Sequence, residues 1–240
     1  MGAAYAEVDP SSVGFDPVAS FALIYGTGPV VAGSGSGGAG GRQVLASTTL
    51  SKAFEAASAA PEIDAIIFRI DSPGGSAMAS DLVWRATQRA RETGKPVIAS
   101  FSDVAASGGY YVACGADRIV SQPATYTGSI GVFVLRPTLG GLFEKFGVGV
   151  ESMTRGEHAD LLLASRPLSP PTRRRLRADV RSVYQTFVDR VAEGRELTPE
   201  GVDAIGRGRV WTGAQASELG LVDALGGLRT AVLEAKRAVG

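Results

Sequence analysis

The sequence predicts an α/β fold with a mostly parallel sheet and a helical C-terminal region. Three observations support this prediction. Short apolar runs alternate with helical patterns along the first half of the chain. These runs are apolar on both faces, as in parallel sheets covered by helices on both sides. The composition, 240 residues with 45% hydrophobic and 20% charged, suits one globular domain.

Six apolar runs predict strands, and three segments between them predict helices. The strand candidates are residues 21–26, 64–70, 96–101, 118–122, 131–135 and 148–153. The helix candidates are residues 48–60, 79–94 and 108–116. This order is typical of a sheet whose strands are joined by crossover helices.

Helical periodicity dominates the C-terminal third. Apolar residues recur on one helix face at Leu176, Val180, Val183, Phe187 and Val191. Thr198 before Pro199 predicts a helix start, and Thr212 with Gln215 predicts a capping box. We therefore expect one domain over residues 21–240, preceded by an N-terminal extension over residues 1–20.

Residues 33–41, "GSGSGGAGG", form the one low-complexity segment. The segment contains the G-x-G-x-x-G spacing of a dinucleotide-binding loop at Gly35, Gly37 and Gly40. Any run of glycine and serine matches this spacing by chance, and no suitable helix opens from it. We expect a flexible loop and no cofactor.

The balance of charges and the scarcity of cysteine and histidine argue against nucleic-acid binding and against a His/Cys metal site. Lys plus Arg and Asp plus Glu both number 24, so no net charge attracts nucleic acid, and the basic run 170–177 suits a solvated helix face. One cysteine and one histidine cannot build a His/Cys metal cluster. The N-terminus lacks the basic and apolar regions of a signal peptide, and no apolar run approaches the roughly 18 residues of a membrane span. We expect the chain itself to be soluble, whether or not it derives from a membrane-anchored parent.

Three turns rich in glycine and serine follow predicted strands, at residues 71–76, 105–111 and 126–131. The carboxyl ends of parallel strands share one edge of a sheet, where ligand sites gather. Ser107 stands at a strand-to-helix junction between small residues and suits a nucleophile. The amides of Gly108 and of the Gly74-Gly75 pair suit oxyanion donors. The same residues also suit a plain helix N-cap and a tight turn, and spacing alone leaves both interpretations open.

Four segments in order carry a family resemblance: "DAIIFRIDSPGGS", the stretch from "GKPVIASF" to "YTGSIGVF", "LFEKFGV" and "GRVWTGAQASELGLVDALGG". From about Phe21 to the C-terminus the chain resembles the signal peptide peptidase A family. The resemblance implies a crotonase-like fold shared with the ClpP proteases and a Ser–Lys dyad that cleaves remnant signal peptides or other unfolded segments. It also implies a bowl-shaped homo-oligomer and a bacterial, membrane-anchored parent whose catalytic domain lies outside the cytoplasm.

The resemblance assigns roles to single residues. Ser107 matches the nucleophile, Gly74 and Gly108 match the oxyanion donors, and Ser129 matches the serine that holds the lysine amine. Gly75 and Tyr110 are expected to contact the peptide substrate, although an aromatic residue here suits the core equally well. No metal or cofactor is implied.

The lysine of the dyad is missing, because its position falls on Ala159 in "RGEHAD". Lys95 precedes a predicted strand, at the end remote from Ser107, and the other lysines, Lys52, Lys145 and Lys236, suit solvated surfaces. His158 neighbours Ala159, but adjacent residues of an extended segment face opposite sides.

Three accounts of Ala159 stay open. The chain is the serine-bearing C-terminal half of the two-domain form, with the lysine on the N-terminal half or on a partner subunit; it carries an engineered Lys→Ala change; or it is an inactive pseudo-protease used as a scaffold. A crotonase-like enzyme acting on acyl-coenzyme A is a further alternative.

Overall fold

A computed structural model describes residues 19–35 and 43–240 of the chain. Most of the expected N-terminal extension, residues 1–20, and most of the expected glycine-serine loop, residues 33–41, lie outside the described residues.

A seven-stranded sheet forms the centre of the molecule. Five strands run in the order β1 (Phe21–Thr27), β4 (Ala65–Ser72), β5 (Val97–Ala106), β6 (Arg118–Ser121) and β9 (Ala224–Leu225), all parallel. The second half of β5 also pairs in parallel with β7 (Tyr126–Gly128), which in turn pairs antiparallel with β8 (Val210–Thr212). The mostly parallel α/β sheet is as the sequence predicts.

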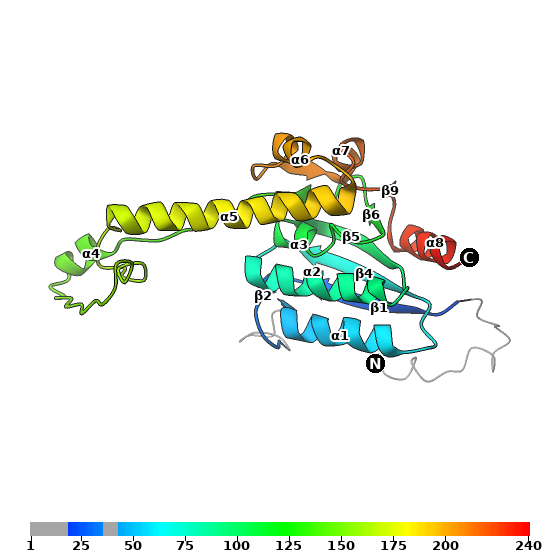
Figure 1. The fold of residues 1–240 in the computed structure, drawn as a ribbon, viewed down its shortest axis with the longest axis horizontal. Coiled ribbons are helices and arrows are strands. Elements are labelled where there is room, and N and C mark those ends of the chain that lie inside the picture. The colour runs from blue at the N-terminus through cyan, green and yellow to red at the C-terminus, as the bar shows by residue number, and fades with distance from the viewer. Residues whose placement is uncertain (1–18, 36–42) are drawn as a thin grey trace.

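Helices cover both faces of this sheet (Figure 1). On one face lie α1 (Ser47–Ala59) and α2 (Ala77–Glu92), side by side. On the other face lies α8 (Leu228–Val239), which packs on the first halves of β4 and β5 through Ala231 and Ala235. Two buried clusters result, because strands buried on both faces contribute apolar side chains to each.

A short ribbon lies beside the carboxyl end of the sheet. It pairs β2 (Val30–Val31) with β3 (Leu45–Ala46), and Val30 also bridges to Gly75 in the turn after β4. This ribbon therefore holds one of the three turns that the sequence singles out.

Four further helices belong to the body at least in part: α3 (Gly108–Tyr111), α5 (Pro170–Arg195), α6 (Pro199–Ile205) and α7 (Gly213–Glu218). Thr198 accepts the amide of Gly201 at the start of α6, and Thr212 with Gln215 forms the predicted capping box at α7. None of the helices in the described part of the chain combines the length and the apolar character that crossing a membrane requires.

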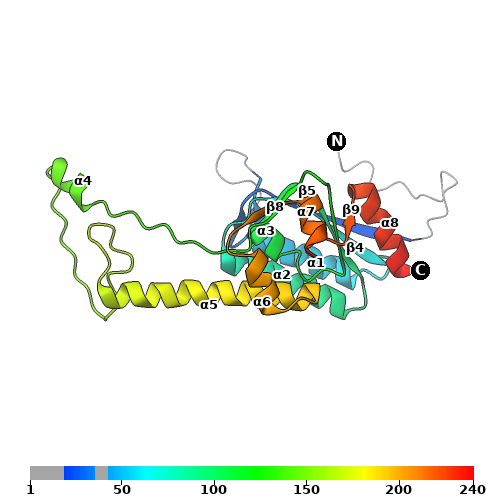
Figure 2. The same cartoon turned by 90° about the horizontal axis from the view of Figure 1, so that it is seen from above.

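Residues 131–169 form an extension that we call the distal arm. It leaves the body, carries α4 (Gly140–Lys145) and returns to the start of α5 (Figure 2). With 26 residues, α5 is about 39 Å long. Its C-terminal half packs on the body through Phe187, Val188 and Val191, and its N-terminal half carries the arm.

The predictions of strands at residues 131–135 and 148–153 are wrong. Both segments lie in the distal arm without regular secondary structure. Their apolar composition suits a strand, but a strand needs a partner edge, and the arm lies beyond the reach of the sheet.

Candidate active site

The three turns predicted to converge meet at one edge of the sheet. Ser72 is in register with Ala105, and Ala106 is in register with Gly128. The strands β4, β5 and β7 thus end beside one another, and the turns that follow them come into contact.

Ser107 follows directly on β5 in an unusual backbone conformation, with φ 54° and ψ −121°. Few residues other than glycine adopt a positive φ, and such strain gathers at functional sites. Its amide donates to the Gly128 carbonyl at 2.9 Å, and its carbonyl accepts the amides of Tyr110 and Tyr111. The surrounding bonds therefore hold the sharp turn, and the side chain remains partly exposed.

The turn after β4 lies directly against Ser107. A Cβ on Gly74, whose φ is +93°, would lie 2.6 Å from the Gly108 nitrogen and 2.8 Å from the Ser107 Cβ. A Cβ on Gly108 would lie 2.5 Å from the Ser80 Oγ and 3.1 Å from the Gly75 nitrogen. Glycine is required at both positions because the two backbones touch.

The two amides of the Gly74-Gly75 pair differ in their surroundings. Gly74 is buried, and its amide donates to the Ser72 Oγ at 3.2 Å. Gly75 is exposed, and its amide has no acceptor among the residues that the structure describes. The resemblance assigns the oxyanion donor to Gly74, whereas Gly75 is the residue of the pair whose amide has no acceptor among the described residues, a difference that the sequence did not indicate.

Ser129 follows β7 just as Ser107 follows β5, and it too has a positive φ, 48°. Its amide donates to the Arg209 carbonyl at 2.7 Å. Because β5 and β7 are paired in register, the two serines leave neighbouring strands at the same edge, and both are partly exposed.

None of the four lysines belongs to this edge of the sheet. Lys95 lies before β5, at the end opposite to Ser107, where its Nζ donates to the carbonyls of Ala57 and Ala60. Lys52 on α1, Lys145 on α4 and Lys236 on α8 are exposed. The site as it stands has a partly exposed serine and nearby backbone amides, but no lysine.

Ala159 lies in a turn of the distal arm that is fastened to the start of α5. The neighbouring Asp160 accepts the Ser169 amide at 2.7 Å and the Thr172 hydroxyl, and His158 Nδ1 lies 3.4 Å from that hydroxyl. The Thr172 hydroxyl, followed by the Ser169 amide, lowers the pKa of Asp160 to about 2. Ala159 and His158 thus stand at the end of α5 that projects away from the body (Figure 2).

The structure corrects the expected substrate contact of Tyr110. Its side chain is fully buried, packs edge-on against Phe101, and donates its hydroxyl to the Leu221 carbonyl at 2.8 Å. Tyr110 is therefore a core residue. Phe133, an apolar residue of the distal arm, is in contrast 88% exposed.

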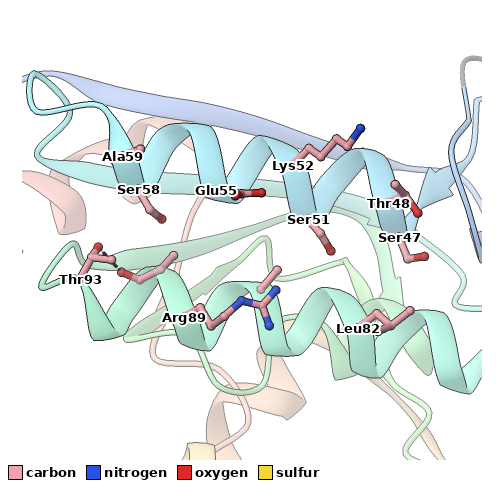
Figure 3. Close-up of a pocket in the computed structure, with 12 residues that line it drawn as sticks. Ser47, Thr48, Ser51, Lys52, Glu55, Ser58, Ala59, Leu82, Arg89 and Thr93 are labelled. Atoms are coloured by element: carbon pink, nitrogen blue, oxygen red, sulfur yellow. Dashed lines mark hydrogen bonds between the residues drawn. The ribbon is translucent and has the colours of Figure 1, made fainter.

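A separate groove of about 610 Å³ lies between α1 and α2 (Figure 3). Small and polar side chains such as Ser51 and Ser58 line it from α1, and Arg89 and Leu82 line it from α2. None of the residues of the three turns contributes to it, so the groove is not part of the serine site.

Comparison with known proteins places the chain in a family. Residues 89–240 match the model of peptidase family S49. The chain is 49% identical to the chloroplastic serine protease SPPA of Arabidopsis thaliana, over 72% of this chain and 26% of that protein. It is 36% identical to protease 4 of Salmonella typhi, over 92% of this chain and 35% of that protein. Protease 4 of Haemophilus influenzae is 38% identical over 74% of this chain and 29% of its own length.

The fold has a solved counterpart in a ClpP1 variant from Listeria monocytogenes. The two structures superpose with a TM-score of 0.56 over 88% of this chain and 94% of that one, at 15% sequence identity. The fold is therefore ClpP-like. The chain spans about a quarter to a third of the length of the relatives named above. The family match covers well over half of the chain, and the chain belongs to peptidase family S49.

Proposed function

We propose that this chain carries the serine half of a Ser–Lys endopeptidase that cleaves remnant signal peptides or other unfolded segments. The contact of the Ser107 turn with the Gly74-Gly75 turn is the observation that supports the proposal most directly. A nucleophile beside two backbone amides is the arrangement that acyl transfer requires.

In this mechanism Ser107 Oγ attacks the carbonyl carbon of the scissile peptide bond and passes its proton to a neutral lysine amine. The oxygen of the tetrahedral intermediate becomes negatively charged and accepts hydrogen bonds from the amides of Gly108 and Gly75. The resulting ammonium gives its proton to the leaving amine, and the C–N bond breaks. Water then attacks the acyl-enzyme, the lysine takes up its proton, and the proton on the lysine returns to Ser107.

The lysine comes from outside this chain, on a preceding domain or a partner subunit. Ser129 lies at the same edge as Ser107, and its hydroxyl orients the incoming amine. A lysine serves as a base only when burial lowers its pKa, so the partner must cover the site as well as supply the residue.

The distal arm is the surface that we propose for this partner. Large apolar side chains are strongly exposed along it, among them Phe133, Leu135 and Leu162. Exposed apolar surface of this kind marks interaction sites. The expected assembly is a homo-oligomer of a membrane-anchored parent whose catalytic domains lie outside the cytoplasm.

Labelling with a fluorophosphonate tests the proposal. We expect Ser107 to be labelled when the lysine-bearing partner is present, and labelling to be lost in Ser107→Ala. In the chain alone, labelling should be slower by a factor of about 100 or more, since general base catalysis contributes about 10²–10⁴-fold. Fast labelling of the isolated chain would show that the base lies within it.

Ala159→Lys tests whether position 159 is the position of the missing lysine base. If Ala159 faces the serine site of a neighbouring copy, the new lysine raises the rate of labelling in the assembled chain, whereas Arg155→Lys, in the same arm, leaves it unchanged. Equal rates in both variants would contradict the placement of the base at position 159.

The alternatives give different results. A scaffold or pseudo-protease shows no labelling under any condition. A crotonase-like enzyme also lacks labelling of Ser107 but binds acyl-coenzyme A, which calorimetry detects. The pair of serines at the sheet edge favours the peptidase, because stabilising an enolate by two amides requires neither hydroxyl.

A further inference from the structure

Two consecutive glycines leave the turn after β4 with unusual freedom. Gly74 and Gly75 both have positive φ values, +93° and +157°. Glycine adopts such values as easily as negative ones, so the peptide units of the turn can rotate unless other bonds hold them. An oxyanion donor is useful only when its N–H already points at the developing charge.

One hydrogen bond, from the β2–β3 ribbon to the turn, fixes the direction of the Gly75 N–H. The Gly74 carbonyl accepts the Val30 amide at 2.9 Å, so it points towards β2. The peptide bond is trans, and the C=O and N–H of a trans unit point in opposite directions. The Gly75 N–H therefore points away from β2, on the side where its nitrogen approaches Gly108.

A second bond holds the preceding peptide unit. The Ser72 side chain is fully buried at the end of β4, and its Oγ accepts the Gly74 amide at 3.2 Å. A serine hydroxyl that accepts the amide two residues on closes a tight turn. Gly109 packs against the backbone of Ser72, since a Cβ on Gly109 would lie 2.5 Å from the Ser72 carbonyl oxygen.

We propose that Ser72 is a positioning residue for the oxyanion site. By accepting the Gly74 amide, its hydroxyl fixes the turn so that the Gly75 amide, rather than that of Gly74, faces the reacting carbonyl beside Gly108. This inference rests on the proposed peptidase function, since Ser72 acts only through the amide that it positions and touches no substrate.

Ser72→Ala tests this role in the assembly in which Ser107 is labelled. We expect kcat for a peptide substrate to fall about 10- to 100-fold, a part of the 10²–10³-fold that the loss of a whole oxyanion donor costs. The KM should change less than twofold, because the ground-state peptide does not use the site. The affinity for a peptide boronate, whose adduct with Ser107 carries the oxyanion, should weaken by the same factor as kcat.

Ser121→Ala is the matched control. Ser121 is also fully buried at the end of a parallel strand, β6, and its hydroxyl bonds only to the Gln122 carbonyl among the described residues. Both variants remove one buried hydroxyl, so both lower the melting temperature, but only Ser72→Ala should change kcat. Ser72→Cys keeps the shape of the side chain with a somewhat larger, weakly accepting sulfur, and should give an intermediate kcat.

The outcomes separate this inference from the function on which it rests. If wild-type Ser107 is labelled and Ser72→Ala keeps the wild-type kcat and boronate affinity, the positioning role is overturned and the peptidase stands. An equal loss of kcat in Ser121→Ala also overturns it, because that loss then follows from stability alone. If wild-type Ser107 is never labelled, both the function and the inference are overturned.

Discussion

The carboxyl edge of the sheet and the distal arm are held in place in different ways. At the edge, Ser72, Ala105 and Ile130 are fully buried, and glycines allow the turns to touch. In the arm, Asp160 is the one buried residue among residues 131–169, and large apolar side chains face solvent.

Hydrogen bonds rather than burial hold the arm. The Arg136 guanidinium donates to the carbonyls of Leu161, Asp160, Leu163 and Arg166, and Asp160 fastens the same loop to α5. The edge is thus shaped by the chain's own core, whereas the arm leaves large apolar side chains exposed, which is why we propose that a partner covers it.

The largest effect on stability is expected at the edge. Gly74→Ala places a Cβ within 2.8 Å of the Gly108 nitrogen and the Ala106 oxygen at a positive φ, so we expect the free energy of unfolding to fall by about 2–4 kcal/mol. Gly141→Ala in the arm meets open space and should change it by less than about 1 kcal/mol. Urea unfolding measures both. Equal losses of unfolding free energy in the two variants would contradict the difference in packing between the edge and the arm.

A smaller effect on stability and a clear effect on assembly are expected in the arm. Leu162→Glu replaces a side chain that is 91% exposed, so the free energy of unfolding should change by no more than about 0.5 kcal/mol. Association should weaken by about tenfold or more, because a charge then enters the interface. Sedimentation analysis measures this, with Leu233→Glu on α8, 46% exposed, as the control. Unchanged association in Leu162→Glu, or an equal loss in the control, would contradict the role of the arm.

The smallest effect is expected from the titration of Asp160. Its pKa in the folded chain, about 2, lies below the ordinary value of 3.8. Its contribution is therefore complete above pH 4 and is lost as the pH falls from about 4 to about 2. Hydrogen exchange over residues 156–172, corrected for intrinsic rates, should become faster across this window. Asp160→Asn should remove the pH dependence; persistence of the dependence in this variant would assign it to another group.

The sequence predicted the elements that carry strong local signals. Four of its six strands, the helices α1 and α2, and the caps at Thr198 and Thr212 are present. It missed β2, β3, β7, β8 and β9, because strands of two or three residues have too few positions to show a period. The apolar runs 131–135 and 148–153 resembled strands, because composition does not reveal whether a partner edge lies within reach.

The sequence alone indicates which turns converge at one edge of the sheet. Small residues around Ser107, Gly74-Gly75 and Ser129 follow apolar runs, and the rule that parallel strands share a carboxyl edge brings them together. The absence of a lysine at position 159 is likewise a property of the sequence.

Which atoms of those turns face one another is seen only in the folded chain. Only there is the Gly74 amide seen to bond to Ser72 while the Gly75 amide stays free among the described residues, and only there is Tyr110 seen to lie in the core. The physical reason is that the direction of a peptide N–H depends on hydrogen bonds to strands distant in sequence. Local residue patterns fix where a chain turns but not how its peptide units are rotated there.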